Sequence, residues 1–154
     1  MRAARISGRP QRETIVRKED MHIADLAAAL QAMGSPLLIP FRLAHECGLE
    51  DTEIVRLRWE DVHLQSRCVF VAGTSKYKKF ATGITASVAE SLRTLQTEWQ
   101  ELGPLPVMVC LDEGGKPYSL QTIRAALVRM CERLEIPGIG WNTIHESWLR
   151  RQGL

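Results

Sequence analysis

Residues 48–62, GLEDTEIVRLRWEDV, place a helix stop and a helix start so close together that they limit how the chain can fold. Gly48 favours the end of a preceding helix. Asp51 or Thr52 can cap a short helix over residues 52–57, because a side-chain oxygen there accepts from backbone amides that have no other partner. The stretch therefore predicts a helix boundary followed at once by a short helix.

Two helices are predicted before this boundary. From Glu19 to Met33, apolar side chains recur at spacings that line one face of a helix, and the Gly-Ser-Pro sequence of residues 34–36 ends it. The more apolar segment LLIPFRLAHEC, residues 37–47, is predicted as a buried second helix that contains Pro40.

Three helical segments are predicted after it. Residues 86–102 have helical periodicity. Their apolar stripe, which we assign to the core, comprises Val88, Leu92, Leu95, Trp99 and Leu102. Ser119 is expected to cap a helix that continues to Leu134 with a second apolar stripe. Thr143 and Glu146 have the spacing of a capping box that opens a last short helix.

Short segments rich in β-branched and aromatic residues predict a small antiparallel sheet. RCVFVAG (67–73) and FATGIT (80–85) flank a basic hairpin tip, and PVMVC (106–110) is predicted as a third strand. The turn DEGGKP (112–117) follows. We therefore expect an α+β fold that is mainly helical, with helices around a three-stranded antiparallel sheet and one helix inserted before the third strand.

Composition sets the class of protein. The 154 residues suffice for one core, and 45% hydrophobic with 25% charged residues is typical of a globular domain. No apolar run reaches the roughly 18 residues of a membrane helix, and the start lacks the apolar segment of a secretion signal, so we expect a cytoplasmic protein without a membrane partner. Neither the four cysteines nor the four histidines have metal-ligand spacing, so we expect buried reduced thiols, no metal and no cofactor.

Positive charge gathers at the start of the chain, although the net charge is only +2. Residues 1–18 are predicted to form a flexible basic arm, and residues 19–154 a single domain. One interpretation of the arm is a solubilising tail. The other is that Arg2, Arg5, Arg9 and Arg12 neutralise nucleic-acid phosphates in a salt-dependent way.

The order of these segments resembles the catalytic domain of the tyrosine recombinases, the phage-integrase family. GLEDTEIVRLRWEDV is similar to the family block Gly-Leu-Arg-x-x-Glu-x-x-x-Leu-x-Trp-x-Asp-Val/Ile, and GTSKYKKFATGIT looks like its β-hairpin. DEGGKPYSLQTIRAALVRMCERLEIP resembles the stretch before the family's His-x-x-Arg box, and WNTIHES resembles that box in degraded form. The likeness covers about residues 19–150.

In that family a tyrosine hydroxyl attacks a DNA phosphodiester and forms a phosphotyrosyl link. Arginines suit this chemistry because a guanidinium can hold two nonbridging oxygens of the charged transition state. A lysine or histidine can give a proton to the leaving oxygen. The resemblance therefore implies DNA as the partner.

The resemblance places altered residues at the family's catalytic positions. Glu50 stands at the first arginine, which exchanges attraction for repulsion of phosphate. Lys76, or Lys78 if the hairpin is shifted, stands at the lysine. In the last box Asn142 and His145 stand at the histidine and the second arginine, while a second register puts Asn142 at the arginine. Lys76 and His145 are therefore interpreted as vestigial catalytic residues.

The resemblance also places the family's tyrosine some tens of residues beyond the last box, past Leu154. Tyr77 and Tyr118 do not match that position. We therefore interpret residues 19–154 as a recombinase-like domain that lacks the tyrosine segment and cannot cleave DNA by itself.

The leading hypothesis is a DNA-associated accessory or remnant of DNA integration or recombination. The predicted DNA-binding residues are Arg2, Arg5, Arg9, Arg12, Arg56, Arg58, Lys76, Lys78, Lys79, Arg150 and Arg151. For Arg150 and Arg151, plain surface charges are the alternative. Two further hypotheses remain open: a module that docks on an intact recombinase or on a second copy of itself, and a residual recombinase completed by a tyrosine from another chain.

Overall fold

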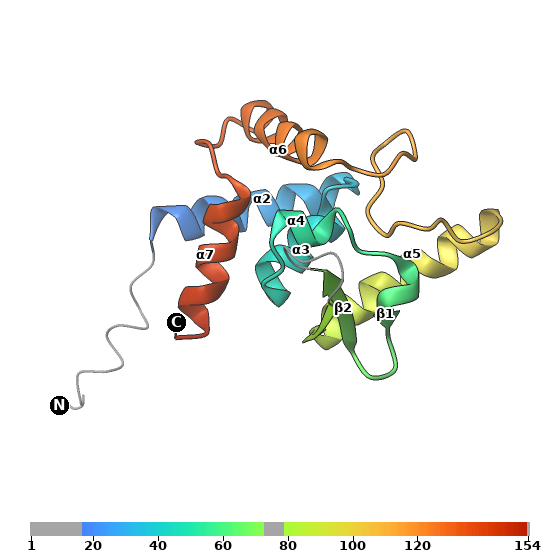
Figure 1. Ribbon diagram of the computed structural model, residues 1–154. Coiled ribbons are helices and arrows are strands. Elements are labelled where there is room, and N and C mark those ends of the chain that lie inside the picture. Colours follow the sequence, from blue (N-terminus) through green and yellow to red (C-terminus); the bar gives the residue numbers. More distant parts are fainter. Residues whose placement is uncertain (1–16, 73–78, 154) are drawn as a thin grey trace.

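The computed structural model describes residues 17–72 and 79–153, and is mainly helical (Figure 1). The α-helices are α2 (Lys18–Met33), α3 (Leu38–Cys47), α4 (Asp51–Ile54), α5 (Ala86–Leu102), α6 (Leu120–Arg133) and α7 (Trp141–Arg151). A 3-10 turn, η1, covers Trp59–Asp61. Helix α2 begins at Lys18, one residue inside the predicted arm. Residues 1–16 of that arm lie outside the described residues.

The sheet has three antiparallel strands in the order β1 (Val62–His63), β2 (Cys68–Ala72) and β3 (Lys79–Gly83). Strands β2 and β3 pair in a continuous register in which Val69 lies opposite Thr82. The predicted fold class is confirmed, including the three-stranded antiparallel sheet.

The predicted third strand over residues 106–110 is wrong. This segment instead pairs with the chain after α4: the Trp59 amide donates to the Val107 carbonyl at 3.0 Å, and the Val109 amide donates to the Leu57 carbonyl at 3.1 Å. Residues 62–63 occupy the place beside β2. Helix α5 therefore follows the sheet and is not inserted into it.

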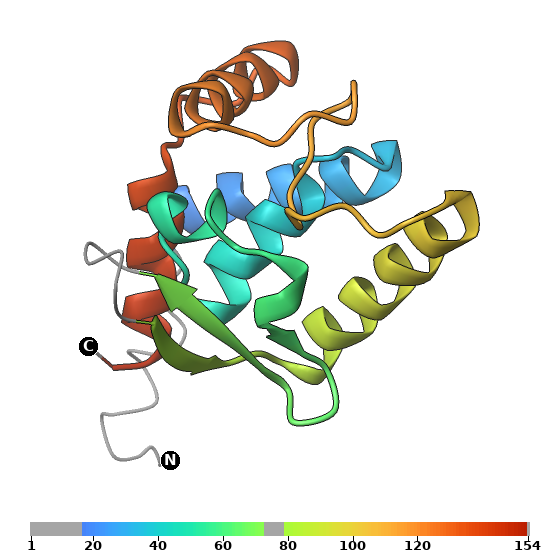
Figure 2. The same cartoon turned by 45° about the vertical axis from the view of Figure 1, so that its right-hand side comes forward.

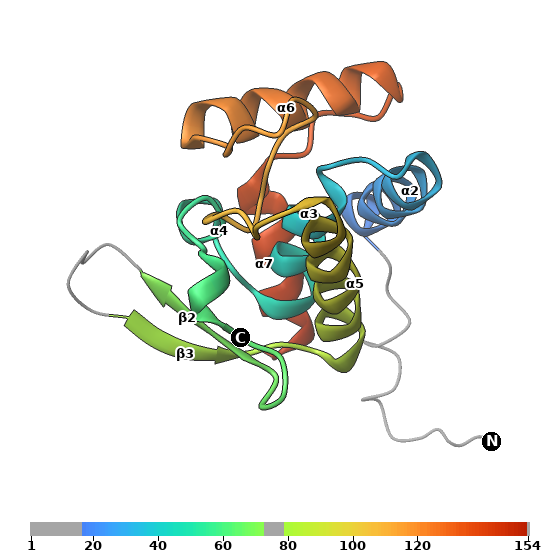
Figure 3. The same ribbon diagram turned by 90° about the vertical axis from the view of Figure 1, so that its right-hand side faces the viewer.

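Helix α3 lies at the centre of the helical part, where α2, α5 and α7 pack against it (Figures 1 and 2). The paired strands β2 and β3 extend away from α2 and α5, toward the opposite side (Figure 3). Helix α6 lies across the outside of α4 (Figure 3). The largest fully buried side chains are Ile23, Leu26, Leu30, Phe41, Leu43, Leu49, Ile54, Leu57, Leu92, Ile123, Leu127 and Ile144.

The bounds predicted for α5 are confirmed, but its stripe is not core throughout. Val88 and Leu92 are buried, whereas Leu102 is 81% exposed. The buried part of the stripe packs against α3, which has only 10 residues against the 17 of α5. The C-terminal end of α5 therefore extends past its neighbour (Figure 2).

The predicted helix start is right for α6 and wrong for α7. Ser119 caps α6 by accepting from the Thr122 amide at 3.1 Å, as predicted. Helix α7 begins at Trp141 with Gly140 as its N-cap, so the predicted capping box at Thr143 is wrong. The earlier start keeps the buried Trp141 on the core face of α7, where its indole Nε1 donates to the Ile123 carbonyl at 3.2 Å.

The four cysteines are free thiols. Cys47, Cys110 and Cys131 are buried as predicted, whereas Cys68 is partly exposed. Burial raises the pKa of Cys110 to about 12. None of the helices within the described residues is long and apolar enough to cross a membrane.

Candidate functional site

Gly48 forms the junction between α3 and α4. It ends α3 in the left-handed conformation, with φ 76°, and its amide donates to the Ala44 carbonyl. A Cβ atom at Gly48 would lie 2.6 Å from ring atoms of Trp148 on α7. Glycine is therefore required here twice, by the backbone angle and by the close approach of an aromatic ring. This contact sets α7 against the start of α4.

Glu50 is the N-cap residue of α4, so the predicted caps Asp51 and Thr52 are wrong. Its backbone amide donates to the Glu53 carboxylate at 2.8 Å, which is the reciprocal bond of a capping box. The side chain of Glu50 is exposed. Its carboxylate therefore adds negative charge at the surface where the resemblance implies an arginine.

Asp51 is buried and faces α6. Its carboxylate Oδ2 accepts from the Arg124 Nε at 2.8 Å. The bond to this carboxylate raises the pKa of Arg124. Because Asp51 is part of α4 and Arg124 part of α6, this ion pair connects the two helices. No local pattern predicts this pair, because the two residues lie 73 positions apart in the chain.

A positively charged pocket opens directly after α4. The cationic pocket has a volume of about 380 Å³ and is lined by Val55, Arg56, Arg58, Ala72, Lys79 and Met108. Three predicted DNA-binding residues are therefore brought together: Arg56, Arg58 and Lys79. Strands β1 and β2 lie between Arg58 and Lys79 along the chain. The convergence of these three residues creates a site that can attract an anion.

Asp61 fixes the position of Lys79 in this pocket. The Lys79 ammonium lies 2.9 Å from both carboxylate oxygens of Asp61. Asp61 is buried, whereas Lys79 is exposed. The tether holds the lysine at the pocket and offsets part of its charge.

Helix α7 presents the residues of the last motif. Asn142 and Glu146 are exposed, and His145 is partly buried. The His145 ring stacks on Trp148 with ring centroids 5.9 Å apart. Its Nδ1 atom is buried and has no hydrogen-bond partner in the described part of the chain. His145 therefore packs beside the ring that contacts Gly48.

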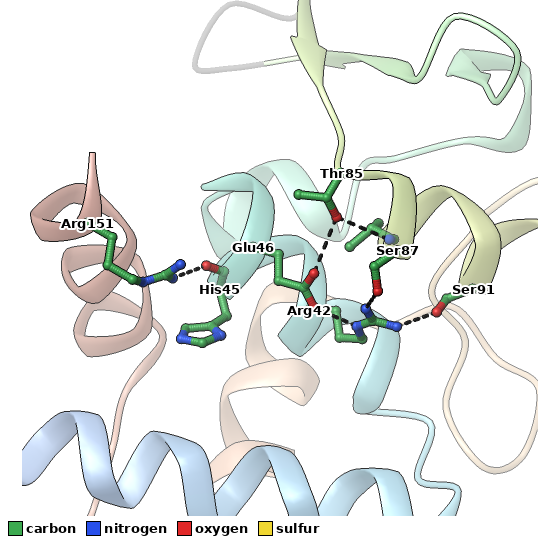
Figure 4. Close-up of polar contacts among 8 residues, drawn as sticks. Arg42, His45, Glu46, Thr85, Ser87, Ser91 and Arg151 are labelled. Carbon is green, nitrogen blue, oxygen red and sulfur yellow. Dashed lines mark hydrogen bonds and ion pairs between the residues drawn. The ribbon is translucent and has the colours of Figure 1, made fainter. Parts of the chain in front are cut away.

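The C-terminal end of α7 is held by α2 and α3. Asp20 on α2 accepts from the Ser147 hydroxyl at 3.0 Å and from the Arg150 guanidinium at 2.9 Å. Arg151 donates to the His45 carbonyl on α3 (Figure 4). Burial, with a smaller contribution from Arg151, lowers the pKa of His45. Arg150 and Arg151 thus have intramolecular partners, and their contact with DNA stays a prediction.

A polar network joins α3 to the start of α5 (Figure 4). The Arg42 guanidinium donates to Glu46 at 2.7 Å and to the Ser87 and Ser91 hydroxyls. Thr85, the N-cap of α5, donates to Glu46 at 3.3 Å. These contacts fix the direction in which α5 leaves the sheet.

The remaining predicted residues divide into two groups. Arg2, Arg5, Arg9, Arg12, Lys76, Tyr77 and Lys78 lie outside the described residues. Tyr118 is buried, and burial together with nearby Asp112 and Glu113 raises its pKa to about 12. Within residues 17–72 and 79–153, no group of three or more His, Cys, Asp and Glu residues could hold a metal ion.

A family comparison and a structural comparison agree on the class of fold. A model of the phage integrase family matches residues 17–152. The fold is similar to XerA recombinase, with a TM-score of 0.69 and 12% identity over 91% of this chain and 51% of that chain. It is also similar to the lambda integrase catalytic core, with a TM-score of 0.65 and 14% identity over 84% of this chain and 78% of that chain.

A third similar structure is the Tn1549 transposon integrase in complex with a circular intermediate DNA. Its TM-score is 0.67, with 9% identity over 87% of this chain and 50% of that chain. The chain thus spans about half the length of the XerA and Tn1549 chains. A search of curated proteins found no match.

Proposed function

Because the chain belongs to the phage integrase family, we propose that it associates with DNA in integration or recombination without cleaving the DNA backbone by itself. The observation that supports this most directly is the pairing of opposite charges around α4. The N-cap of α4 is an exposed glutamate, while residues after the helix form part of the cationic pocket.

The cationic pocket suits a nonscissile backbone phosphate. Arg56 and Arg58 supply guanidinium groups, which can bind phosphate oxygens in a bidentate way, and Lys79 supplies a compact positive charge. Contacts of this kind give affinity without sequence choice and make binding dependent on salt. The proposed binding is therefore electrostatic and weakly selective.

Loss of cleavage follows from the residues at the catalytic positions. Glu50 repels phosphate, and Asn142 cannot transfer a proton as histidine can. His145 stands where the resemblance implies the second arginine, and its ring is partly buried against Trp148. None of these three residues offers the permanent positive charge that stabilises a phosphoryl transition state.

Similar solved structures support DNA as the partner. Lambda integrase was solved bound to a COC′ core site, and Tn1549 integrase in complex with transposon DNA. The resemblance to these proteins is in fold, so the choice of DNA site is not transferred with it. We propose DNA binding for this chain on the fold together with its own cationic pocket.

The salt dependence of DNA binding tests the proposal. We expect fluorescence anisotropy to show duplex binding that weakens with salt, and the Arg56→Ala/Arg58→Ala variant to reduce the slope of log affinity against log salt by about 1.8. The matched control is Arg93→Ala/Lys116→Ala, which removes equal charge from exposed positions outside the pocket. Equal slopes for the two variants, or no binding at low salt, would contradict the proposal.

A further inference from the structure

The apolar stripe of α5 continues beyond the core as an exposed, acidic helix end. Leu95 and Trp99 are partly buried and Leu102 is 81% exposed, although all three belong to one stripe. Glu98 and Glu101 flank Leu102 and are exposed. The exposed end of α5, residues 98–102, therefore combines an uncovered leucine with two carboxylates.

A groove of complementary character lies along α6. The α6 groove has a volume of about 510 Å³ and lies between α6, the connection from α2 to α3 and the turn at residues 112–114. Leu37, Ala126 and Met130 supply apolar lining. Arg129 and Arg133, one helical turn apart, supply positive charge to the same groove.

The two arginines are available to a partner. Both are exposed, and neither forms a hydrogen bond or ion pair with another residue in the described ranges. Asp112 and Glu113 also line the groove, but they belong to the turn and not to α6. The groove therefore has an apolar lining with positive charge on α6 and negative charge on the turn.

We propose that the end of α5 in one copy docks into the α6 groove of a second copy. Leu102 would enter the apolar lining, while Glu98 and Glu101 would pair with Arg129 and Arg133. Repulsion from Asp112 and Glu113 disfavours the reverse orientation of this acidic end. The inference goes beyond the proposed DNA binding, because it concerns a different surface and a protein partner.

The α6 groove suits an acidic apolar segment better than a nucleic acid. Leu37, Ala126 and Met130 lie in the same groove as the α6 arginines, and an apolar side chain such as Leu102 can be buried against them, whereas a nucleic-acid backbone offers no comparable apolar group. Because the donor and acceptor surfaces differ, the contact is head-to-tail. Such a contact leaves one donor and one groove free in each pair, so the assembly extends or closes into a ring.

Charge reversal in the full chain tests this docking. Sedimentation equilibrium should show that the wild-type chain self-associates without DNA. Glu98→Arg/Glu101→Arg and Arg129→Glu/Arg133→Glu should each raise the dissociation constant at least about tenfold. Leu102→Lys should do the same, and because Leu102 is exposed this change should leave the circular dichroism spectrum intact.

Mixing the two charge-reversed variants gives the sharpest readout. The unchanged groove of the first variant matches the unchanged helix end of the second, and the two reversed surfaces also match each other. Association should therefore return in the mixture. The control Glu60→Arg/Glu90→Arg makes the same change in net charge at exposed positions elsewhere and should self-associate as the wild type does.

Three outcomes would overturn the inference. A wild-type chain that stays monomeric with and without DNA would do so, as would a mixture that remains dissociated. The third is an Arg129→Glu/Arg133→Glu variant that loses DNA affinity and keeps its self-association, because the groove would then serve nucleic acid.

Discussion

The resemblance places the family's two arginine-bearing motifs at the start of α4 and in helix α7, and we interpret the two segments as altered in different ways. Around α4 the apolar residues of the motif, Leu49, Leu57 and Trp59, are buried, while Glu50 stands where the resemblance implies an arginine. In α7 we interpret the motif itself as altered, yet Trp141, Ile144 and Ser147 are buried and hold the helix in place. The α4 segment resembles the family motif in most of its residues, whereas α7 resembles it mainly in being a packed helix.

This difference teaches that packing and chemistry are separable in such a site. In the capping box of α4 the Glu53 carboxylate accepts from the backbone amide of Glu50, and any residue except proline could supply that amide. Helix α7 is fixed by Trp148 against Gly48 and by Asp20 at its far end. None of these contacts needs a catalytic side chain, so the fold persists when the chemical residues change.

The largest expected effect tests the contact between the two segments. Gly48→Ala places a Cβ against the Trp148 ring and forces a non-glycine residue to φ 76°. We expect a loss of about 3 kcal/mol in the free energy of unfolding, from backbone strain and overpacking together. Urea denaturation followed by circular dichroism measures it.

Gly34→Ala provides the matched control for this variant. Gly34 also has a positive φ, 61°, but an added Cβ would meet nothing within 4 Å. Its expected cost is therefore the backbone strain alone, about 1 kcal/mol. Equal losses for the two variants would mean that α7 does not press against the α3–α4 junction.

A smaller effect is expected where α7 meets α2. Asp20→Ala removes the acceptor for the buried Ser147 hydroxyl and for the Arg150 guanidinium. We expect a loss of about 1–2 kcal/mol in unfolding free energy. A double-mutant cycle with Ser147→Ala separates the hydroxyl contact, and additive losses would show that Asp20 and Ser147 do not interact.

The smallest effect concerns pH. Because burial lowers the pKa of His45 from 6.5, the unfolded chain binds more protons than the folded chain as pH falls through and below that value. Stability contributed by neutral His45 is present above pH 6.5 and is lost as pH falls toward the lowered pKa. Thermal unfolding at several pH values should show that the stability of His45→Gln depends less steeply on pH in this range. An unchanged slope would mean that another group causes the pH dependence.

Local patterns were sufficient for much of the fold. Periodicity predicted the bounds of α5 correctly. Ser119 predicted the start of α6, because capping depends only on neighbouring residues. Periodicity could show which face of α5 is apolar, but it could not show that α3 is too short to cover Leu102. Residues 106–110 have strand-like composition, and only the folded chain shows that they pair with residues 57–59.

The candidate site was less predictable. Glu50, Arg56 and Arg58 stand in one contiguous motif, so the sequence alone could single them out as candidates. The ion pair between Asp51 and Arg124 depends on the packing of α6 on α4, and the tether from Asp61 to Lys79 depends on the return of β3. Contacts between distant segments leave no periodic signal in the chain.

The DNA affinity of Glu50→Arg as a function of salt tests the central claim most directly. The backbone amide of residue 50 still reaches Glu53 in this variant, so we expect the fold to be retained. If Glu50 faces a phosphate-binding surface, the variant binds duplex DNA more tightly than the wild type, and the slope of log affinity against log salt steepens by about 0.9. Unchanged affinity and slope in a folded variant would contradict the account, because residue 50 would then lie away from DNA.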